Sequence, residues 1–184
     1  MPVLSVDIPV LETDRLVLRE PRADDMPASS AFMASDRASF VGGGAQAVSR
    51  DGARGGEWAA WRGLTSALGH WLLRGFGSWT IEDRAIGKVA GRVGFIHHSV
   101  WPEPELGWHI YDGFEGKGIA YEAAMAARAA GLRLFGLDRV ISHIDAANTR
   151  SRRLAERMGA VVERDGELLG RPCLVYRHPA EAAA

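Results

Sequence analysis

The sequence predicts an α+β fold in which a mixed, largely antiparallel sheet of about seven strands carries helices on both faces. Three observations lead to this prediction. Apolar residues alternate with polar ones in seven short segments and recur at helical spacing in four longer ones. A run of neighbouring strand segments comes before a part of the chain in which strands and helices alternate. Helices that connect strands in this way pack against the faces of a sheet. No linker, repeat or low-complexity block divides the 184 residues, so we expect one domain over 1–184.

The first part of the chain predicts one strand followed by two helices. LETDRLVLRE alternates over Leu11–Arg19, which indicates the first strand. In RADDMPASSAFMAS, acidic residues precede an apolar spacing, which favours a short helix. The glycine-rich stretch 40–56 indicates a loop. Over Glu57–Leu73 apolar residues recur at helical spacing, and Gly75 or Gly77 is expected to end this helix.

The rest of the chain predicts six strands and two helices. GSWTIEDRAIGKVAGRVGFIHHS indicates two strands joined by a turn near Asp83–Arg84, and ELGWHIYD indicates a third over Glu105–Tyr111. The remaining elements then alternate: a helix over Gly118–Phe135 that ends at Gly136, a strand over Arg139–Ile144, a helix in TRSRRLAERMG that ends at Gly159, and two strands in AVVERDG and RPCLVYRHP. We expect the core at about 11–179 and a loose tail at 180–184.

Composition excludes several classes of function. The formal net charge is -1, so no broad attraction to nucleic acid or to an anionic membrane is expected. One cysteine, Cys173, excludes an intrachain disulfide and a cysteine metal cluster. No basic region followed by a long apolar run opens the sequence, and no apolar run approaches the roughly 18 residues of a membrane helix. We therefore expect a cytoplasmic protein without a metal and without a nucleic-acid or membrane partner.

The stretch FEGKGIAYEA, Phe114–Ala123, indicates a phosphate-binding turn at the start of a helix. A P-loop is excluded because Gly116–Lys117 is followed by Gly118 instead of serine or threonine. A dinucleotide-binding fingerprint is excluded because Tyr121 stands where its third glycine belongs. Glycines still let a phosphate approach backbone N–H groups at a helix N-terminus, where the helix dipole favours negative charge. An ordinary strand-to-helix turn is the alternative.

Together with its neighbours, this stretch resembles the acetyl-CoA pyrophosphate loop of the GCN5-related N-acetyltransferase (GNAT) superfamily. The family pattern is Gln/Arg-x-x-Gly-x-Gly/Ala, and residues 115–120 here are EGKGIA. ELGWHIYD resembles the family's fourth strand, and IDAANTRSRRLAERMGA resembles its fifth strand and the helix that follows. LETDRLVLRE and LVYRHP are similar to the ribosomal-protein N-terminal (RimJ/RimL-like) branch, so the resemblance covers about Leu11–Pro179. Two positions depart from it: Glu115 replaces Gln or Arg, and Ala155 replaces a tyrosine that many members use as acid.

The resemblance implies a GNAT fold whose fourth and fifth strands splay apart to admit the pantetheine arm of acetyl-CoA. It implies a β-bulge that turns N–H groups of the fourth strand toward the cofactor, with the N–H of His109 or Ile110 polarising the thioester carbonyl. Asn148 would bind the pantetheine amide, although asparagine also suits a helix N-cap. The implied cofactor-binding residues are Trp108, His109, Ile110, Tyr111, Gly116, Lys117, Gly118, Ile119, Ala120, Asn148 and Ser151.

Acetyl transfer to an amine needs an acid for the leaving thiolate and an acceptor for the amine proton. Ser151, one turn before Ala155, is the expected acid, and a plain first-turn serine is the alternative. Because relatives often hold a carboxylate at the start of the fourth strand, the resemblance favours Glu105 as base. His109 shares the face of Glu105 by the period of two and titrates near neutral pH, so it is a second candidate. The third alternative is that no side chain acts as a dedicated base.

Aromatic residues outside these motifs divide into two groups. Trp58, Trp61 and Trp71 share the apolar stripe of the Glu57–Leu73 helix, so we expect them to pack in the core. Trp101, in the loop WPEPE, is a candidate wall of the acceptor site, and a turn packed by Trp and Pro is the alternative.

These residues predict an N-acetyltransferase that moves the acetyl group of acetyl-CoA directly to a primary amine, without a covalent enzyme intermediate. The acceptor is expected to be a protein N-terminus or a small-molecule amine, and the chain a monomer or homodimer. The alternative is a GNAT-fold module that binds acyl-CoA with weak or lost catalysis and serves sensing or assembly. Glu115 and Ala155 favour this alternative, whereas Ser151 and Glu105 favour the enzyme.

Overall fold

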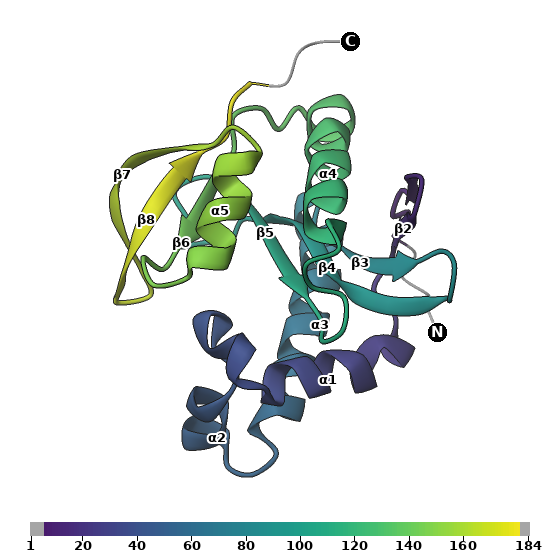
Figure 1. Cartoon of the computed structure of the whole chain (residues 1–184), viewed down its shortest axis with the longest axis vertical. Helices are drawn as coiled ribbons and strands as arrows, with labels where there is room; N and C mark the ends of the chain where they lie inside the picture. Colours follow the sequence, from purple (N-terminus) through teal and green to yellow (C-terminus); the bar gives the residue numbers. More distant parts are fainter. Residues whose placement is uncertain (1–5, 181–184) are drawn as a thin grey trace.

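The computed structural model describes residues 6–180, so residues 181–184 of the predicted tail lie outside it. Its elements in chain order (Figure 1) are β1 (Leu11–Glu12), β2 (Leu16–Arg19), η1 (Ala23–Asp25), α1 (Met26–Ala34), η2 (Asp36–Val41), α2 (Ala45–Asp51), α3 (Gly55–Arg74), β3 (Ser78–Asp83), β4 (Lys88–Ile96), β5 (Glu105–Ile110), α4 (Ile119–Phe135), β6 (Ile141–Ile144), α5 (Thr149–Arg157), β7 (Val161–Leu168) and β8 (Arg171–Arg177). None of these described helices is long and apolar enough to cross a membrane.

Within residues 6–180, one sheet of eight strands runs in the order β1-β2-β3-β4-β5-β6-β8-β7. Its neighbouring strands are antiparallel except β5 and β6, which are parallel. The helices α1 and α3 lie behind the sheet in Figure 1 or below it, whereas α4 and α5 lie in front. The predicted mixed, largely antiparallel sheet with helices on both faces is therefore confirmed.

The two parallel strands, β5 and β6, part soon after they meet. Their paired register is limited to Glu105 opposite Ile141, and the strands diverge toward the carboxyl end of β5 (Figure 1). These are the strands that the sequence prediction counts as the fourth and fifth, so the predicted splay between them is confirmed. On the sides away from this gap, β5 stays paired with β4 and β6 stays paired with β8.

One strand more than predicted arises because Leu11–Arg19 is a tight hairpin instead of a single strand. The Thr13 N–H donates to the Leu16 carbonyl oxygen at 3.0 Å, and Thr13 Oγ1 accepts from the Leu16 N–H at 3.0 Å. This turn folds β1 back onto β2 and sets Leu11 opposite Leu18. The alternation of apolar residues continues through the turn, so the pattern gave no sign of the break.

The loop predicted over 40–56 is wrong in part, because α2 lies inside it. Gly44 precedes this helix with φ 59° and Gly52 follows it with φ 78°, both in the left-handed region that favours glycine. At Gly55, an added Cβ would lie 2.1 Å from the carbonyl oxygen of the buried Ala47. The glycines therefore serve helix ends and close packing, whereas their abundance alone suggested an irregular segment.

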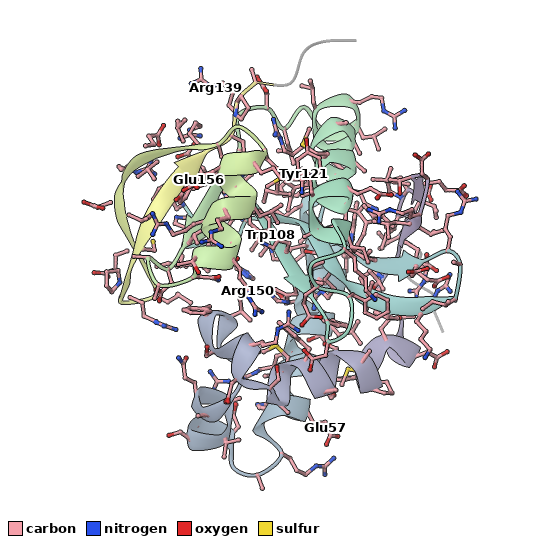
Figure 2. All side chains as sticks on the ribbon, viewed as in Figure 1. Glu57, Trp108, Tyr121, Arg139, Arg150 and Glu156 are labelled. Carbon is pink, nitrogen blue, oxygen red and sulfur yellow. The ribbon has the colours of Figure 1, made fainter. Side chains whose placement is uncertain are left out.

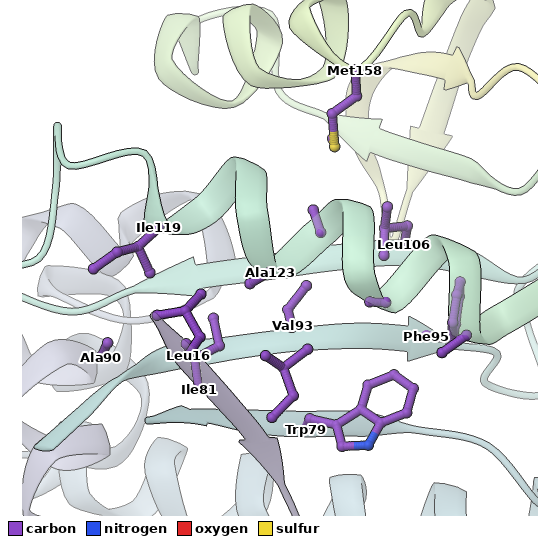
Figure 3. Close-up of a cluster of buried hydrophobic side chains, with 14 of the residues drawn as sticks. Leu16, Trp79, Ile81, Ala90, Val93, Phe95, Leu106, Ile119, Ala123 and Met158 are labelled. Carbon is purple, nitrogen blue, oxygen red and sulfur yellow. The ribbon is translucent and has the colours of Figure 1, made fainter. Parts of the chain in front are cut away.

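The helix α4 packs closely on the sheet because its inner face consists of small residues (Figure 3). Ala123, Ala124 and Ala127 have no exposed surface. At Gly131, an added Cβ would lie 2.3 Å from Cζ of Phe95, so the ring of Phe95 occupies the space that a side chain would need. This packing fixes the N-terminus of α4 beside the carboxyl end of β5.

The helix α3 buries a different face from the predicted one. Trp71 is buried in the core as predicted, but Trp58 and Trp61 are each 48% exposed, so core packing is wrong for these two. Small residues, among them Ala59 and Ala60, form the buried face instead. They allow α3 to lie close to α1, and large side chains on that face would hold the helices apart.

Candidate active site

A cavity of about 900 Å³ lies beside the diverging end of β5. Figure 2 shows Trp108 of β5, Tyr121 of α4 and Arg150 of α5 along the gap between these elements. The lining comes from α1, η2, β5, the turn before α4 with the first turn of that helix, and α5 with the loop before it. It includes Phe32, Asp36, Arg37, Phe40, Val41, Trp108, His109, Ile110, Phe114, Glu115, Gly116, Gly118, Ile119, Ala120, Tyr121, Ala147, Asn148, Thr149, Arg150, Ser151, Arg153, Leu154 and Arg157.

The N-terminus of α4 opens onto this cavity. Gly116 and Gly118 have φ values of 72° and 79°, in the left-handed region, and they turn the chain into the helix. Gly118 is the N-cap and supplies no side chain, so the first-turn N–H groups of Ile119 and Ala120 receive no side-chain cap. Because a helix leaves its first N–H groups without intrahelical partners and with partial positive charge, this terminus suits an anion.

Lys117, in the same turn, contributes its backbone to the fold of the loop. Its carbonyl oxygen accepts from Arg15 Nη1 at 2.9 Å, and Arg15 also forms an ion pair with Glu122 of α4. The Lys117 ammonium lies 5.5 Å from the centroid of the Phe114 ring. The side chain of Lys117 is not among the groups that line the cavity, so its predicted charge contact is not part of the observed geometry.

Glu115, which departs from the family pattern, forms an ion pair across the cavity mouth. Its Oε1 lies 3.0 Å from Nη1 of Arg37, and the same guanidinium contacts the carboxylate of Asp112. Arg37 Nη2 also donates to the Ile110 carbonyl oxygen at 3.0 Å. Arg37 therefore offsets the negative charge of Glu115 beside the phosphate-binding turn, and sequence reasoning did not identify it.

The β-bulge expected in β5 is absent, because the register of β5 with β4 runs without a shift from Glu105 to Ile110. The Tyr111 N–H donates to the Ala90 carbonyl oxygen of β4 at 2.9 Å. Since N–H directions alternate along a strand, the His109 N–H also points toward β4, and the N–H groups of Trp108 and Ile110 point toward the gap. Of the two predicted oxyanion donors, the geometry therefore favours Ile110.

Tyr111, a predicted cofactor contact, lies away from the cavity. It is buried, and its ring stacks on Phe32 with a centroid distance of 5.1 Å. Its place after the end of β5 turns the ring toward α1, on the face of the sheet opposite α4. This placement gives Tyr111 a packing role.

The first turn of α5 places Asn148 and Ser151 at the cavity wall. Asn148 Oδ1 accepts from the Ser151 N–H at 3.1 Å, which is the N-cap role that sequence reasoning kept as an alternative. Ala155, one turn later, is fully buried in a cluster with Ile144 and Tyr176. A tyrosine at position 155 would have no room in this cluster, and the hydroxyl-bearing residues of this helix that line the cavity are Thr149 and Ser151.

The two candidate bases have different surroundings. Glu105 is buried where β5 meets β6, and its Oε2 accepts from Trp101 Nε1 at 2.6 Å and lies 2.8 Å from His143 Nδ1. Neither Glu105 nor Trp101 lines the cavity. His109 does line the cavity, but burial, together with the positive charge of Arg92, lowers its pKa to about 3. His109 is therefore neutral at physiological pH and a weak proton acceptor.

Four arginines that sequence reasoning did not assign to the site line the cavity: Arg37, Arg150, Arg153 and Arg157. Arg157 lies over the ring of Tyr121 at 4.2 Å from the centroid, which links α5 to the first turn of α4. The basic run TRSRR was visible in the sequence, but its direction toward the cavity depends on how α5 is placed. Four guanidinium groups near an open helix N-terminus suit a ligand with several negative charges.

The family model of the acetyltransferase (GNAT) domain matches residues 15–161 of the chain. The chain belongs to the GNAT acetyltransferase family. Among solved structures, this GNAT chain is similar to an acetyltransferase from Agrobacterium tumefaciens strain C58, with 34% identity, a TM-score of 0.81 and coverage of 97% of this chain and 98% of that one.

Two more distant structures share the fold. The ribosomal-protein-S5-alanine acetyltransferase from Vibrio fischeri is 13% identical, with a TM-score of 0.70 over 96% of this chain and 98% of that chain. The microcin C7 self-immunity acetyltransferase MccE, solved in complex with acetyl-CoA and AMP, is 15% identical, with a TM-score of 0.67 over 91% of this chain and 93% of that one. The predictions of a RimJ/RimL-like GNAT protein and of an acyltransferase are confirmed.

Proposed function

We propose that this acetyltransferase moves the acetyl group of acetyl-CoA directly to a primary amine, either of a protein N-terminus or of a small molecule. The observation that carries the proposal is the uncapped N-terminus of α4, which opens onto a cavity of about 900 Å³ beside the parting strands. The complex of MccE with acetyl-CoA and AMP supports the cofactor, and the Vibrio fischeri ribosomal-protein-S5-alanine acetyltransferase supports a protein as one acceptor class.

The residues present fit acetyl-CoA at three points. The backbone N–H groups of residues 116–120 would hold the pyrophosphate, since they lie at a helix N-terminus and two glycines keep the approach open. Asn148 would bind the pantetheine amide through its side-chain N–H₂, because its Oδ1 is already used as the helix cap. Arg150, Arg153 and Arg157 would attract the remaining phosphate charge.

Acetyl-CoA supplies the thioester whose acyl–sulfur bond breaks as the new amide bond forms. The Ile110 N–H, which points toward the gap, would stabilise negative charge on the thioester oxygen. The hydroxyl of Ser151 would donate a proton to the leaving sulfur and recover one from solvent. Both groups line the same cavity as the phosphate-binding turn, so one bound cofactor could reach all of them.

Neither of the two predicted bases offers the amine proton a strong acceptor in the cavity. Glu105 is held by Trp101 and His143, and His109 is a weak base. We therefore propose that the amine binds in its neutral form and loses its second proton to solvent. A rate that rises with pH up to the pKa of the acceptor amine supports this assignment. An inflection that Glu105→Gln abolishes supports Glu105 as base instead.

The proposal is tested by release of free thiol from acetyl-CoA in the presence of a panel of amines and N-terminal peptides. We expect release that depends on the acceptor and an acetylated amine seen by mass spectrometry. Tight binding of CoA with no release for any acceptor would contradict the proposal and favour an acyl-CoA-binding module. A cytoplasmic location remains a prediction, which fractionation of the cells that make the protein would test.

A further inference from the structure

The parting of β5 and β6 begins at one position of their ladder. The Ile141 N–H donates to the Pro104 carbonyl oxygen at 3.2 Å. Since the bonds of a parallel ladder recur every two residues along each strand, the next bond of this kind would join the His143 N–H to the Leu106 carbonyl oxygen. The paired register ends at Glu105 opposite Ile141, so that bond is not made. Both backbone groups need other partners, because an unpaired polar group is costly inside a protein.

The Leu106 carbonyl oxygen is bound by a side chain on one face of the sheet. Ser142 Oγ donates to it at 2.6 Å. Because this bond uses the one hydroxyl hydrogen of Ser142, its Oγ accepts from Nε2 of His178, 2.9 Å away. The side chains of Ser142 and His178 are both buried. His178 therefore keeps the hydroxyl of Ser142 directed at the β5 backbone.

The His143 N–H is bound by a side chain on the other face. It donates to Glu105 Oε1 at 3.4 Å, and Glu105 Oε2 lies 2.8 Å from Nδ1 of the same histidine. Trp101 Nε1 donates to Oε2 at 2.6 Å and fixes the buried carboxylate. Successive side chains of a strand alternate, so His143 and its partner Glu105 lie on the face opposite Ser142. One side-chain bond on each face thus replaces the missing ladder bond.

From these bonds, we propose that Ser142 and Glu105 are positioning residues that keep β5 and β6 apart and hold open the slot for acetyl-CoA. Paired strands lie about 4.8 Å apart, which leaves no room for a ligand chain between them. A further ladder bond would therefore shorten the slot at its closed end. A bulge is not the cause of the parting, because β5 follows β4 without a shift of register. The use of the slot by the pantetheine arm rests on the proposed function, whereas the replacement of the ladder bond does not.

Two substitutions together release the backbone groups. Ser142→Ala frees the Leu106 carbonyl oxygen. Glu105→Gln weakens the hold on the His143 N–H, because the amide NH₂ of glutamine faces the N–H of either His143 or Trp101, whichever way it lies. The released groups can then bond to each other. If the paired state becomes about nine times as populated as the open state, the apparent CoA dissociation constant of the double variant rises about tenfold.

Amide hydrogen exchange of the full chain, followed by NMR, tests the replacement of the ladder bond. We expect the His143 N–H to exchange more slowly in Ser142→Ala than in the unmodified protein, because its 3.4 Å bond to Glu105 gives way to a ladder bond. Faster exchange in this variant would overturn the proposal. Ser142→Ala removes a single oxygen atom, so this measurement decides the matter even if the double variant does not fold.

Calorimetry with CoA and thermal melting test whether the slot depends on these bonds. We expect the double variant to melt above the temperature that the two single losses add up to, because a ladder bond replaces the two lost bonds. Its CoA affinity should nevertheless be about tenfold weaker. A general base acts on the amine, so the loss of a base alone would leave CoA affinity unchanged.

Thr80→Val is the matched control for loss of a buried hydroxyl. Thr80 Oγ1 donates to Asp25 at 2.7 Å, and Thr80 does not line the cavity. This variant should lower the melting temperature and leave CoA affinity unchanged. CoA affinity that is unchanged in the double variant, or reduced as much by Thr80→Val, would overturn the proposal. Failure of the unmodified protein to bind CoA would contradict the proposed function instead, since the exchange measurement does not use the cofactor.

Discussion

The ion pair between Arg37 and Glu115 leads to a quantitative prediction about cofactor binding. Arg37 contacts two carboxylates at the cavity mouth, those of Glu115 and Asp112, so the three groups together carry one negative charge. Arg37→Ala raises this to two negative charges, and Glu115→Gln reduces it to none. The double variant carries one negative charge, as the unmodified protein does. Binding of a polyanionic cofactor should follow this order of charge.

The size of the effect follows from Coulomb's law. A unit charge about 10 Å from a pyrophosphate with two charges contributes about 1.7 kcal/mol at an effective dielectric constant of ~40. The side chains of Arg37 and Glu115 are 27% and 35% exposed, so solvent and salt lower this to about 1 kcal/mol. We therefore expect Arg37→Ala to weaken CoA binding about fivefold and Glu115→Gln to strengthen it by a similar factor.

Isothermal titration calorimetry with CoA, at low and at high salt, measures these affinities. The double variant should bind as the unmodified protein does, and all the differences should shrink at high salt. Arg84→Ala is the matched control, because it removes an exposed arginine whose partner is Glu12, away from the cavity. If the double variant binds as weakly as Arg37→Ala, or if salt changes none of the differences, the electrostatic role assigned to this pair is refuted.

Further predictions concern catalysis, the phosphate-binding turn and acid stability. Ser151→Ala should lower kcat about ten- to hundredfold in the thiol-release assay and leave the CoA dissociation constant unchanged. A loss of CoA affinity as large as the loss of kcat would contradict the role of Ser151 as acid. Gly118→Ala should weaken CoA binding in calorimetry, because φ 79° costs alanine about 1–2 kcal/mol, and unchanged affinity would argue against this turn. Burial alone would raise the pKa of Asp25, but hydrogen bonds from Arg19 and Thr80 outweigh it and hold this pKa below its ordinary value. Its stabilising contribution is therefore complete at neutral pH and is lost as pH falls below about 4. Asp25→Asn should cost about 3 kcal/mol in urea unfolding at pH 7 and flatten the acid dependence, and a variant that retains this dependence would contradict the assignment.

Local periodicity was sufficient to predict most elements of the fold. The helix α4 and the strands β3, β4 and β5 follow from apolar spacing and from glycines at their ends, which are local signals. The hairpin of β1 and β2 could not be predicted this way, because the Thr13 turn keeps the alternation of the strand. The burial of Trp58 and Trp61 was predicted wrongly because α3 has small residues on one face and large apolar residues on another. Either face could be the buried one, and only the packing of the helix decides between them.

The candidate site was partly predictable for the same reason. The turn before α4 and the Asn148–Ser151 segment carry local patterns, and both line the cavity. Arg37 pairs with Glu115 from a distant segment, and nothing in either segment alone indicates the contact. Glu105 lies in a strand as predicted, but its carboxylate binds His143 of the next strand, which only the parallel pairing of β5 and β6 brings near.

A crystal structure of the chain with bound CoA tests the central claim most directly. We expect the pyrophosphate on the N–H groups of residues 116–120, the pantetheine arm between β5 and β6, and the thiol within reach of Ser151. A cofactor bound elsewhere, or a pyrophosphate that does not contact the N-terminus of α4, would contradict the account.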